Sequence, residues 1–485
     1  MASSNAKIQN EVYFSLLPVK KRERTYGMWD LMAVQICFGI AAWFFLTGAQ
    51  TGMLLPAREA IPTILFGNCI PICLIAFIGI ASSRYGVEQL TVSSGIFGQK
   101  GSVLMLIFYM VACYPALAVA TLMFGQSATK FIKQLNGPAV LSSETSGVVI
   151  LAVAALIIGV YIAFLGPNAL RWFTRLSAIF MMLIIAALIV YIFKYYGISN
   201  IWNAEPAEPY VFEGNPELGT AWSRATALEV NVGLGLSWGF FFGQWTRLAR
   251  TEGNGYHGCM WGWGVLAAVA GVFAAFTALA IGVYDPTLWI VQVSNEVGNN
   301  VLSIIGLLLM AVANVTSVAT LVYPEAISIR ARFPKIGWVA ALALGSIPTL
   351  FLLFPSVYYM ISKVYAIIGL LTGIYSAIVV SDFLFISKGK FRIREFFSTK
   401  NGYQYANGWN PAALIAIAAG FITYLSILNP LTWTSATGLF PYISAGLPTF
   451  FITAIVYTVL MKAWIVKKYK IPFVNDMEIE GEQKL

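Results

Sequence analysis

The chain has 485 residues, of which 59% are hydrophobic and only 11% are charged. Soluble globular proteins carry about 25% charged residues, so the composition excludes a soluble enzyme or binding domain and indicates a polytopic membrane protein. The net charge of +9 needs no nucleic-acid partner, because basic residues at helix ends can face anionic lipid.

Twelve apolar stretches are long enough to cross a bilayer, which takes about 20 helical residues. In chain order they are residues 28–54, 61–81, 102–128, 147–165, 177–198, 226–246, 258–283, 300–322, 337–355, 361–385, 411–428 and 436–464. We therefore expect an all-α fold with twelve transmembrane helices. A polar tail of residues 1–26 precedes this transporter domain of residues 27–464, and a second tail of residues 465–485 follows it.

The basic residues predict which side of the membrane each loop faces. When the spans alternate in direction from a cytoplasmic N-terminus, 24 of the 30 Lys and Arg residues fall in cytoplasmic segments. This is the bias of the positive-inside rule. We therefore expect a multi-pass protein of the plasma membrane with both tails in the cytoplasm.

The sixth span carries glycines at positions 233, 235, 239 and 243, together with polar and aromatic residues. One interpretation is a helix broken inside the membrane, which in secondary transporters marks the solute site. Its binding residues would then be Asn231, Gly235, Trp238, Phe240 and Gln244. The other interpretation is that glycines spaced by four form a face for close helix packing. The sequence of this stretch leaves both open.

The first span is interrupted in the same way, by Gly39, Gly48 and Gly52. Two interrupted spans placed five apart are what an inverted repeat of five plus five helices produces. We expect the first repeat at about residues 27–198, the second at about 226–385, and two additional helices at about 411–464.

Four further stretches carry a family resemblance. They are Arg84–Ser102, Leu165–Trp172, Ser381–Leu384 and Lys388–Asn410. In this order and spacing they resemble motifs of nucleobase–cation symport family 1. The resemblance implies a fold like that of the leucine transporter. It also implies cation-coupled uptake of a small nitrogenous heterocycle, such as a nucleobase, allantoin, a hydantoin or a related vitamin, by alternating access.

The resemblance also implies where the substrate binds, and here the chain departs from the family. Members that bind flat rings clamp them between aromatic residues of spans three and six, but these positions hold Ala116 and Gly235. Thr320 stands where the family has an amide. Either nearby rings rebuild the clamp or the substrate is not flat, such as an amino acid or amine. Besides the span-six residues, the substrate candidates are therefore Ala41, Tyr114, Ala116 and Thr320.

The coupling cation is Na⁺ or H⁺. By the resemblance, sodium would be held by backbone carbonyls of span one and hydroxyls of span eight. These candidates are Cys37, Ile40, Thr316 and Ser317, with Asn314 as an alternative when the register is counted back from Pro324. A proton carrier would be a buried carboxylate, and Glu229 is the only acidic residue well inside a predicted central span.

Other classes of function fit the sequence less well. No hydrolase, P-loop or metalloenzyme motif occurs, so we expect neither an enzyme nor a cofactor other than a sodium ion. A membrane sensor that does not transport would need a signalling domain, and tails of about 26 and 21 residues are too short for one.

Overall fold

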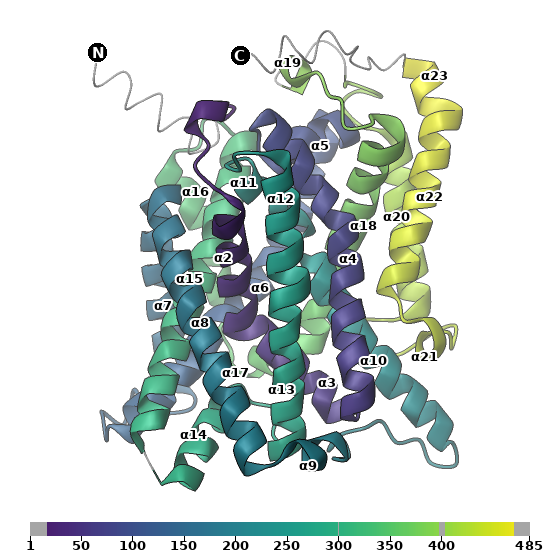
Figure 1. Ribbon diagram of the computed structural model, residues 1–485. Helices are drawn as coiled ribbons and strands as arrows, with labels where there is room; N and C mark the ends of the chain where they lie inside the picture. Colours follow the sequence, from purple (N-terminus) through teal and green to yellow (C-terminus); the bar gives the residue numbers. More distant parts are fainter. Residues whose placement is uncertain (1–16, 299, 397–402, 470–485) are drawn as a thin grey trace, which may run out of the picture.

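The computed structural model describes residues 17–298, 300–396 and 403–469, which form a bundle of roughly parallel helices (Figure 1). These described residues contain helices and no β-strand, as predicted. Within the described part of the chain, eight helices are long and apolar enough to cross a membrane. They are α4 (Ala57–Tyr85), α6 (Gln99–Gln134), α7 (Ser146–Phe164), α8 (Pro167–Tyr195), α12 with α13 (Glu252–Ile281), α15 (Asn300–Arg332), α18 with its last turn (Ile361–Ile386) and α22 with α23 (Gly446–Tyr469).

The other four predicted spans are interrupted or short. Spans one and six are each divided into two helices. Span nine consists of α16 (Trp338–Leu344) and a 3-10 segment (Ile347–Leu352), and span eleven is α20 (Pro411–Ile427). Every predicted span therefore corresponds to a helix or a pair of helices. The repeat boundaries at residues 27–198 and 226–385 stay a prediction.

Short elements lie at the two ends of the bundle. The described chain ends lie at the same end of the bundle as α5 (Gln89–Phe97) and α19 (Ile393–Phe396), and we call this end the chain-end face (Figure 1). The helices α9 (Ile198–Trp202) and α14 (Pro286–Val297) lie at the opposite face. The remaining short elements are a 3-10 turn (Lys21–Glu23), α17 (Pro355–Tyr358) and α21 (Phe440–Ile443).

Local sequence explains several helix boundaries. Proline is the first residue of α8, α10, α14 and α20, where its missing N–H costs no hydrogen bond. The side chains of Asn215, Asp285 and Asn410 cap three of these helices by accepting a backbone N–H. Helix α4 ends at Gly86, whose φ of 70° is easily adopted only by glycine.

Span one is broken at the predicted glycine. Helix α2 (Met28–Phe38) passes into a π-helical segment (Gly39–Trp43) and continues as α3 (Phe44–Leu54). A Cβ on Gly39 would lie 3.0 Å from the Trp263 ring, and Cβ atoms on Gly48 or Gly52 would overlap the backbone of α13. The glycines therefore let this span approach span seven closely.

Span six shows both the break and the close packing that its glycines suggested, and its role as a solute site stays a prediction. Helix α10 (Pro216–Ser237) ends in a 3-10 turn (Trp238–Phe240), and α11 (Phe242–Thr246) follows. A Cβ on Gly235 would lie 3.0 Å from the Gly67 carbonyl of α4. Cβ atoms on Gly239 and Gly243 would overlap side chains of α18 and α5. The helix is broken, and its glycines also serve close packing.

Span eight is longer than predicted. Helix α15 continues through Pro324 to Arg332, ten residues past the expected end near residue 322. Proline is tolerated within membrane helices because neighbouring groups compensate for the lost hydrogen bond. The extension buries Glu325 completely, so the prediction that Glu229 is the only acidic residue within a central span was wrong.

Candidate functional site

Aromatic rings from three spans meet at the two helix breaks. The Phe38 ring stacks on Trp43 and on Trp263 of span seven, with centroid distances of 5.6 Å to each. Its centroid lies 4.5 Å from that of Trp238, the residue that begins the break in span six. All four side chains are buried. Of these rings, the glycine pattern of the sequence identified Trp238 and missed the other three.

A second stack continues this cluster. The Phe240 ring lies between Tyr109 of α6, with centroids 5.3 Å apart, and Tyr375 of α18, at 4.2 Å. Tyr114, the ring expected near the span-three position, lies away from this stack and donates a hydrogen bond to the Leu344 carbonyl of α16. Ala116 is buried two helical turns beyond Tyr109. Of the two tyrosines near the span-three position, Tyr109 packs on Phe240 of span six, and Tyr114 bonds α16.

Several polar atoms within the two stacks have no hydrogen-bond partner among the described residues. They are the indole nitrogens of Trp43, Trp238 and Trp263, the Tyr109 hydroxyl and the Ser376 hydroxyl. Buried donors in proteins are nearly always paired, so a concentration of unpaired donors among stacked rings indicates where a polar, ring-shaped ligand can bind. We call these five residues, together with Phe38, Phe240 and Tyr375, the aromatic site.

Side chains from other helices satisfy the backbone groups freed by the breaks. In span six, the Gln89 amide of α5 donates to the Gly239 carbonyl, and its oxygen accepts from the Gly243 N–H at 2.7 Å. The same amide donates to the Tyr375 hydroxyl at 3.0 Å. In span one, the Tyr365 hydroxyl donates to the Trp43 carbonyl at 3.1 Å. Backbone without helical partners persists inside a membrane protein only with such help.

Three predicted substrate residues of span six lie outside the aromatic site: Gly235, which packs against the backbone of α4, Asn231 and Gln244. Asn231 accepts a hydrogen bond from Asn68 at 2.8 Å and donates to Thr51 at 2.9 Å, so it joins spans one, two and six. It lies seven residues before Trp238, roughly 10 Å along the helix. Gln244 donates to the Ser328 hydroxyl of α15 at 2.7 Å, towards the chain-end face. Both side chains link helices to one another.

The cation candidates of span eight divide between two neighbouring spans. Ser317 donates to the Phe38 carbonyl, where span one begins to break, at 3.5 Å. Thr316 faces α8 instead, with 2.8 Å between its hydroxyl and that of Ser177. Thr320 bonds the backbone of its own helix. The side-chain oxygen of Asn314 is buried without a partner among the described residues.

These positions supply oxygen atoms, the ligands that hard cations prefer. Asn314 and Ser317 are three residues apart and therefore share a helix face. The Phe38 carbonyl adds a backbone oxygen opposite Ser317. Cys37 and Ile40, on either side of the break's first turn, are buried. Ala41 lies in the π-helical segment, and its side chain is outside the described residues.

Glu229 faces the last two spans. It accepts hydrogen bonds from the Tyr424 hydroxyl at 2.7 Å, the Ser444 hydroxyl at 2.5 Å, and the backbone N–H groups of Ala445 and Gly446 at 2.8 and 2.9 Å. Four donors suit an ionised carboxylate. Glu229 therefore fixes α10 to α20 and to the start of α22.

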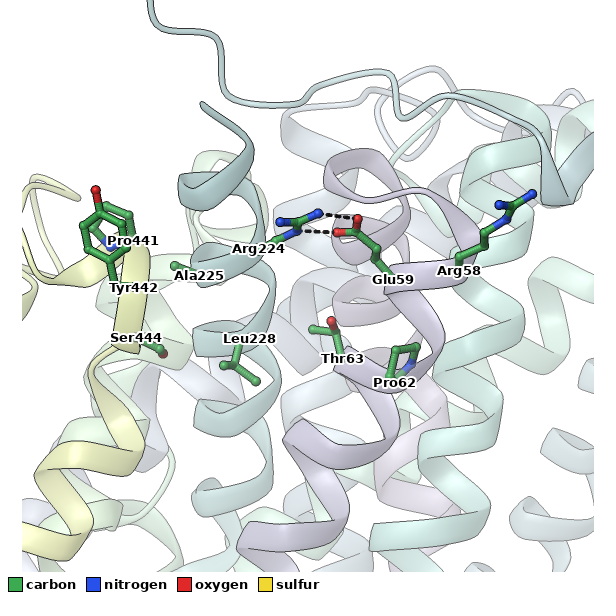
Figure 2. A pocket seen from close by; sticks show the side chains of 10 residues that line it. All are labelled: Arg58, Glu59, Pro62, Thr63, Arg224, Ala225, Leu228, Pro441, Tyr442 and Ser444. Carbon is green, nitrogen blue, oxygen red and sulfur yellow. Dashed lines mark hydrogen bonds and ion pairs between the residues drawn. The ribbon is translucent and has the colours of Figure 1, made fainter. Parts of the chain in front are cut away.

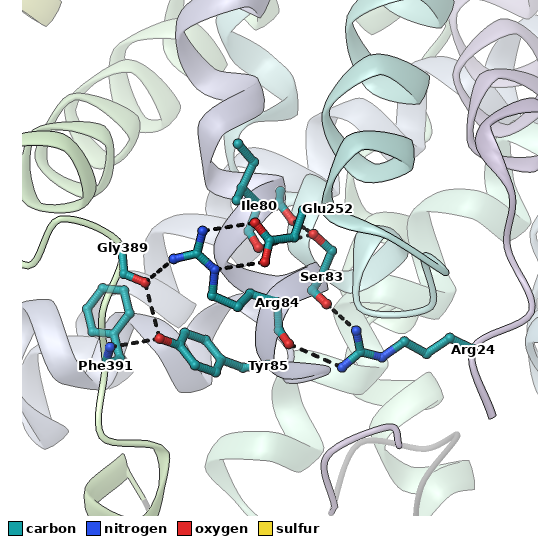
Figure 3. A network of polar contacts seen from close by, with 9 residues as sticks. Arg24, Ile80, Ser83, Arg84, Tyr85, Glu252, Gly389 and Phe391 are labelled. Atoms are coloured by element: carbon teal, nitrogen blue, oxygen red, sulfur yellow. Dashed lines mark hydrogen bonds and ion pairs between the residues drawn. The ribbon is translucent and has the colours of Figure 1, made fainter. Parts of the chain in front are cut away.

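A network of polar contacts joins four segments at the chain-end face (Figure 3). Arg84, at the end of α4, forms a two-point ion pair with Glu252 at 2.9 Å and donates to the Gly389 carbonyl at 2.6 Å. Tyr85 also donates to Gly389, and Arg24 of the N-terminal segment donates to the Ser83 carbonyl. The network therefore ties α4 to the N-terminal segment, to α12 and to the segment around Gly389 at this face.

A cleft of about 510 Å³ opens at the opposite face, between α4, α10 and α21 (Figure 2). Arg224 and Glu59 form a two-point ion pair beside it, with distances of 2.6 and 2.7 Å. Leu228, one of the lining residues, lies ten residues from Trp238, roughly 15 Å along the helix. The cleft is therefore separate from the aromatic site.

A bundle of spanning helices, two of them interrupted around a buried aromatic site, defines a secondary transporter. Residues 18–444 match the model of a protein family described as permeases for cytosine/purines, uracil, thiamine and allantoin. The chain belongs to this family, the one its motifs resemble, and is a transporter rather than an enzyme. Comparison with curated proteins found no match.

Solved structures with the same fold include two of Mhp1, a nucleobase-cation-symport-1 family transporter. The match to its closed conformation with bromovinylhydantoin bound has a TM-score of 0.77 and 16% sequence identity. This match covers 96% of this chain and 98% of the Mhp1 chain. Its inward-facing conformation has a TM-score of 0.74 at the same identity, with 96% of each chain covered. A Na⁺-coupled sialic acid symporter in a substrate-bound outward-open state has a TM-score of 0.58 and 12% identity, with 95% of each chain covered. The leucine-transporter-like fold expected from the motifs is confirmed.

Proposed function

We propose that the protein takes up a small, planar nitrogenous heterocycle by cation-coupled symport, and that the aromatic site binds it. The observation that carries this proposal is the set of unpaired buried donors among stacked rings. A heterocycle offers flat faces for stacking and ring nitrogens or carbonyls that accept hydrogen bonds. The bound hydantoin of Mhp1, a transporter with the same fold, supports this substrate class.

Trp238 is the central residue of this proposed site. It belongs to the break in span six and contacts Phe38, Phe241 and Trp263, with ring centroids 4.5 to 5.0 Å apart. Its unpaired indole N–H can donate to a carbonyl of the substrate, as can those of Trp43 and Trp263. A clamp rebuilt from Tyr109, Trp238 and Phe240 replaces the rings that Ala116 and Gly235 do not supply.

The proposed coupling ion is sodium. The Phe38 carbonyl, the Ser317 hydroxyl and the Asn314 amide oxygen would hold it, with backbone carbonyls of Cys37 and Ile40 as further ligands. Oxygen dipoles of this kind suit a hard monovalent cation. A bound cation would stabilise the broken turn of span one, which carries Trp43 of the aromatic site. Ion binding and substrate binding would thereby favour the same arrangement of span one.

The proposal places the protein in the plasma membrane, with the chain-end face in the cytoplasm. The basic residues at this face support the assignment. Alternating access then requires the network around Arg84, Glu252 and Gly389 to separate before substrate can leave inward. The opposite face must open in the other half of the cycle.

Uptake into proteoliposomes tests the proposal. Radiolabelled purines, pyrimidines, allantoin and amino acids are supplied first with an inward sodium gradient and no pH gradient, and then with the gradients exchanged. We expect saturable uptake of one planar heterocycle that follows the sodium gradient. Uptake of amino acids alone would show that a non-planar solute uses this scaffold, and uptake that follows only the pH gradient would exclude sodium coupling.

A further inference from the structure

Glu325 is a carboxylate buried between three helices that the proposed transport cycle does not use. It lies on α15, seven residues before Arg332 at the end of that helix, and is 0% exposed. The Cys113 thiol of α6 lies beside it. At the end of α16, a Cβ on Gly345 would lie 3.4 Å from the carboxyl carbon. The carboxyl group is thus enclosed by α6, α15 and α16.

Glu325 differs from the other buried carboxylates of the described chain in its lack of partners. Asp30 pairs with Arg171 and Arg175, and Asp285 pairs with Lys130. Each of the remaining three accepts hydrogen bonds from N–H or O–H groups, and these three are Glu88, Glu229 and Asp382. Within the described residues neither oxygen of Glu325 accepts such a bond. The neighbouring thiol is only a weak donor.

An ionised carboxylate in this position would be costly. Isolated charges within a membrane cost several kcal/mol, and proteins retain them mainly for function. A buried charge without hydrogen bonds or an opposite charge becomes neutral instead. The geometry around Glu325 therefore favours the carboxylic acid, which carries a proton.

The surrounding elements supply no compensating cation. The titratable side chains that α6 turns towards Glu325 are Tyr109, Cys113 and Tyr114, all uncharged at neutral pH. The described residues of α7 and α16 include no charged residue. On α8, Arg171 and Arg175 pair with Asp30. On α15 itself, Arg330 donates to the Ile336 carbonyl and Arg332 bonds Gln99 and Ser102. Arg247, which follows α11, bonds Tyr323.

We propose that Glu325 is a proton-binding site and that it links the conformational cycle to pH. In the conformation described, in which the network around Arg84 is formed and Glu325 is buried, the site holds its proton. When α6, α15 and α16 separate and water reaches the carboxyl group, the proton passes to water and a hydrated carboxylate remains. Acidic pH then favours the closed chain-end face, and alkaline pH favours its opening. The effect on transport rests on the proposed symport, whereas proton binding does not.

Infrared difference spectroscopy of the purified protein tests the proton site without transport. The carbonyl stretch of a protonated carboxylic acid should be present at neutral pH and lost in Glu325→Gln. It should be retained in Glu229→Gln, because Glu229 is surrounded by donors to its ionised form. Cys113→Ala keeps the carboxyl group and should shift the band, which keeps the test valid if Glu325→Gln fails to fold. A band absent from the native protein, or unchanged in both Glu325→Gln and Cys113→Ala, would overturn the proposal.

Sodium-driven uptake measured at several pH values, equal on both sides of the membrane, tests the linkage. Native uptake should vary with pH, and this dependence should be lost in Glu325→Gln at an unchanged sodium gradient. An equal pH dependence in both proteins would refute the linkage. Failure of the native protein to take up any substrate would refute the proposed symport but leave the infrared result standing.

Discussion

Trp238 carries the largest share of the proposed substrate contact. We expect Trp238→Ala to weaken binding of the transported heterocycle by about 10- to 100-fold, because stacking on an aromatic ring contributes about 1–3 kcal/mol per base. Equilibrium binding to the purified protein measures the change. The control is Trp464→Ala, which removes a tryptophan of the last span whose side chain is 37% exposed. Equal affinity in native and Trp238→Ala proteins would remove Trp238 from the site.

Ser317 and Thr316 offer a matched pair for the sodium site. They are adjacent hydroxyls on α15, but only Ser317 faces the broken span one. We expect Ser317→Ala to raise the sodium concentration for half-maximal uptake by about tenfold, since one lost polar contact costs roughly 1–1.5 kcal/mol. Thr316→Ala should change it little. A larger effect of Thr316→Ala than of Ser317→Ala would place the ion between spans five and eight.

At the residue scale, sequence reasoning located the broken turns but not the side chains that meet there. Trp238 was identifiable because it follows a run of glycines. Phe38 lies next to the glycine that interrupts span one and Trp263 lies in span seven, and only the folded chain brings their rings together. The sequence predicts Asn231 and Gln244 as substrate-binding residues because they are amides within an apolar span. Their partners, Asn68 and Ser328, are distant in sequence, so the sequence does not reveal their role.

Among the elements, the short helix α5 is predicted to control the break in span six. Gln89 holds the freed carbonyl of Gly239 and the N–H of Gly243. We expect Gln89→Ala to favour opening of the chain-end face, measured as faster reaction of a cysteine placed at buried Ser94 with a thiol reagent. Gln292→Ala, on α14 at the opposite face, should leave the rate unchanged. An unaltered rate in Gln89→Ala would show that α5 is only a connector.

The contact between Glu229 and the last two spans predicts a graded loss of stability. Tyr424→Phe removes one of four donors and should cost about 1–2 kcal/mol, near the upper limit found for hydrogen bonds in membrane proteins. Glu229→Gln should cost more, because the amide keeps only one acceptor oxygen for the three donors at Oε2 and presents an NH₂ group to the Tyr424 hydroxyl, which now donates to Oε1. Thermal unfolding in detergent measures both. If Glu229→Gln unfolds at the native temperature, the contact contributes nothing to stability.

Element boundaries were the least predictable part of the fold. The apolar stretch in the sequence predicts that span eight ends near residue 322. In the structure α15 stays helical and mostly buried as far as Ile329, since α6, α7 and α16 cover it. Tertiary packing therefore overrides the local signal. For the same reason, the apolar pattern alone places Glu325 outside span eight, although it lies within α15.

For the whole molecule, the arrangement of charge predicts the orientation in the membrane. Lys467, on α23, is exposed at the chain-end face, and Glu213 is exposed in the loop before α10. In intact cells we expect Lys467→Cys to react only with membrane-permeant thiol reagents, and Glu213→Cys to react also with impermeant ones. The native protein, whose described cysteines are buried or half-buried, is the control. Labelling of position 467 from outside would invert the topology.

The overall architecture was predictable because a bilayer imposes a length on every span and a charge bias on every loop. Twelve apolar stretches and two glycine-interrupted spans were sufficient for the fold class. Which helices pack against one another could not be predicted, because the apolar faces of membrane helices look alike in sequence. Span three, for example, packs against span eight, and the polar pairs between them, such as Gln134 with Ser303, join residues far apart in the sequence.

The four hydrogen bonds that Glu229 accepts also predict whether the protein tolerates truncation after span ten. All four donors belong to residues after position 410, in α20 and at the start of α22. A chain that ended after span ten would keep every residue of the aromatic site. It would leave the Glu229 carboxyl group within the bilayer without any of these four donors. The ten-helix unit is therefore not self-sufficient here, and gene fragments that encode it alone should yield protein that the cell degrades.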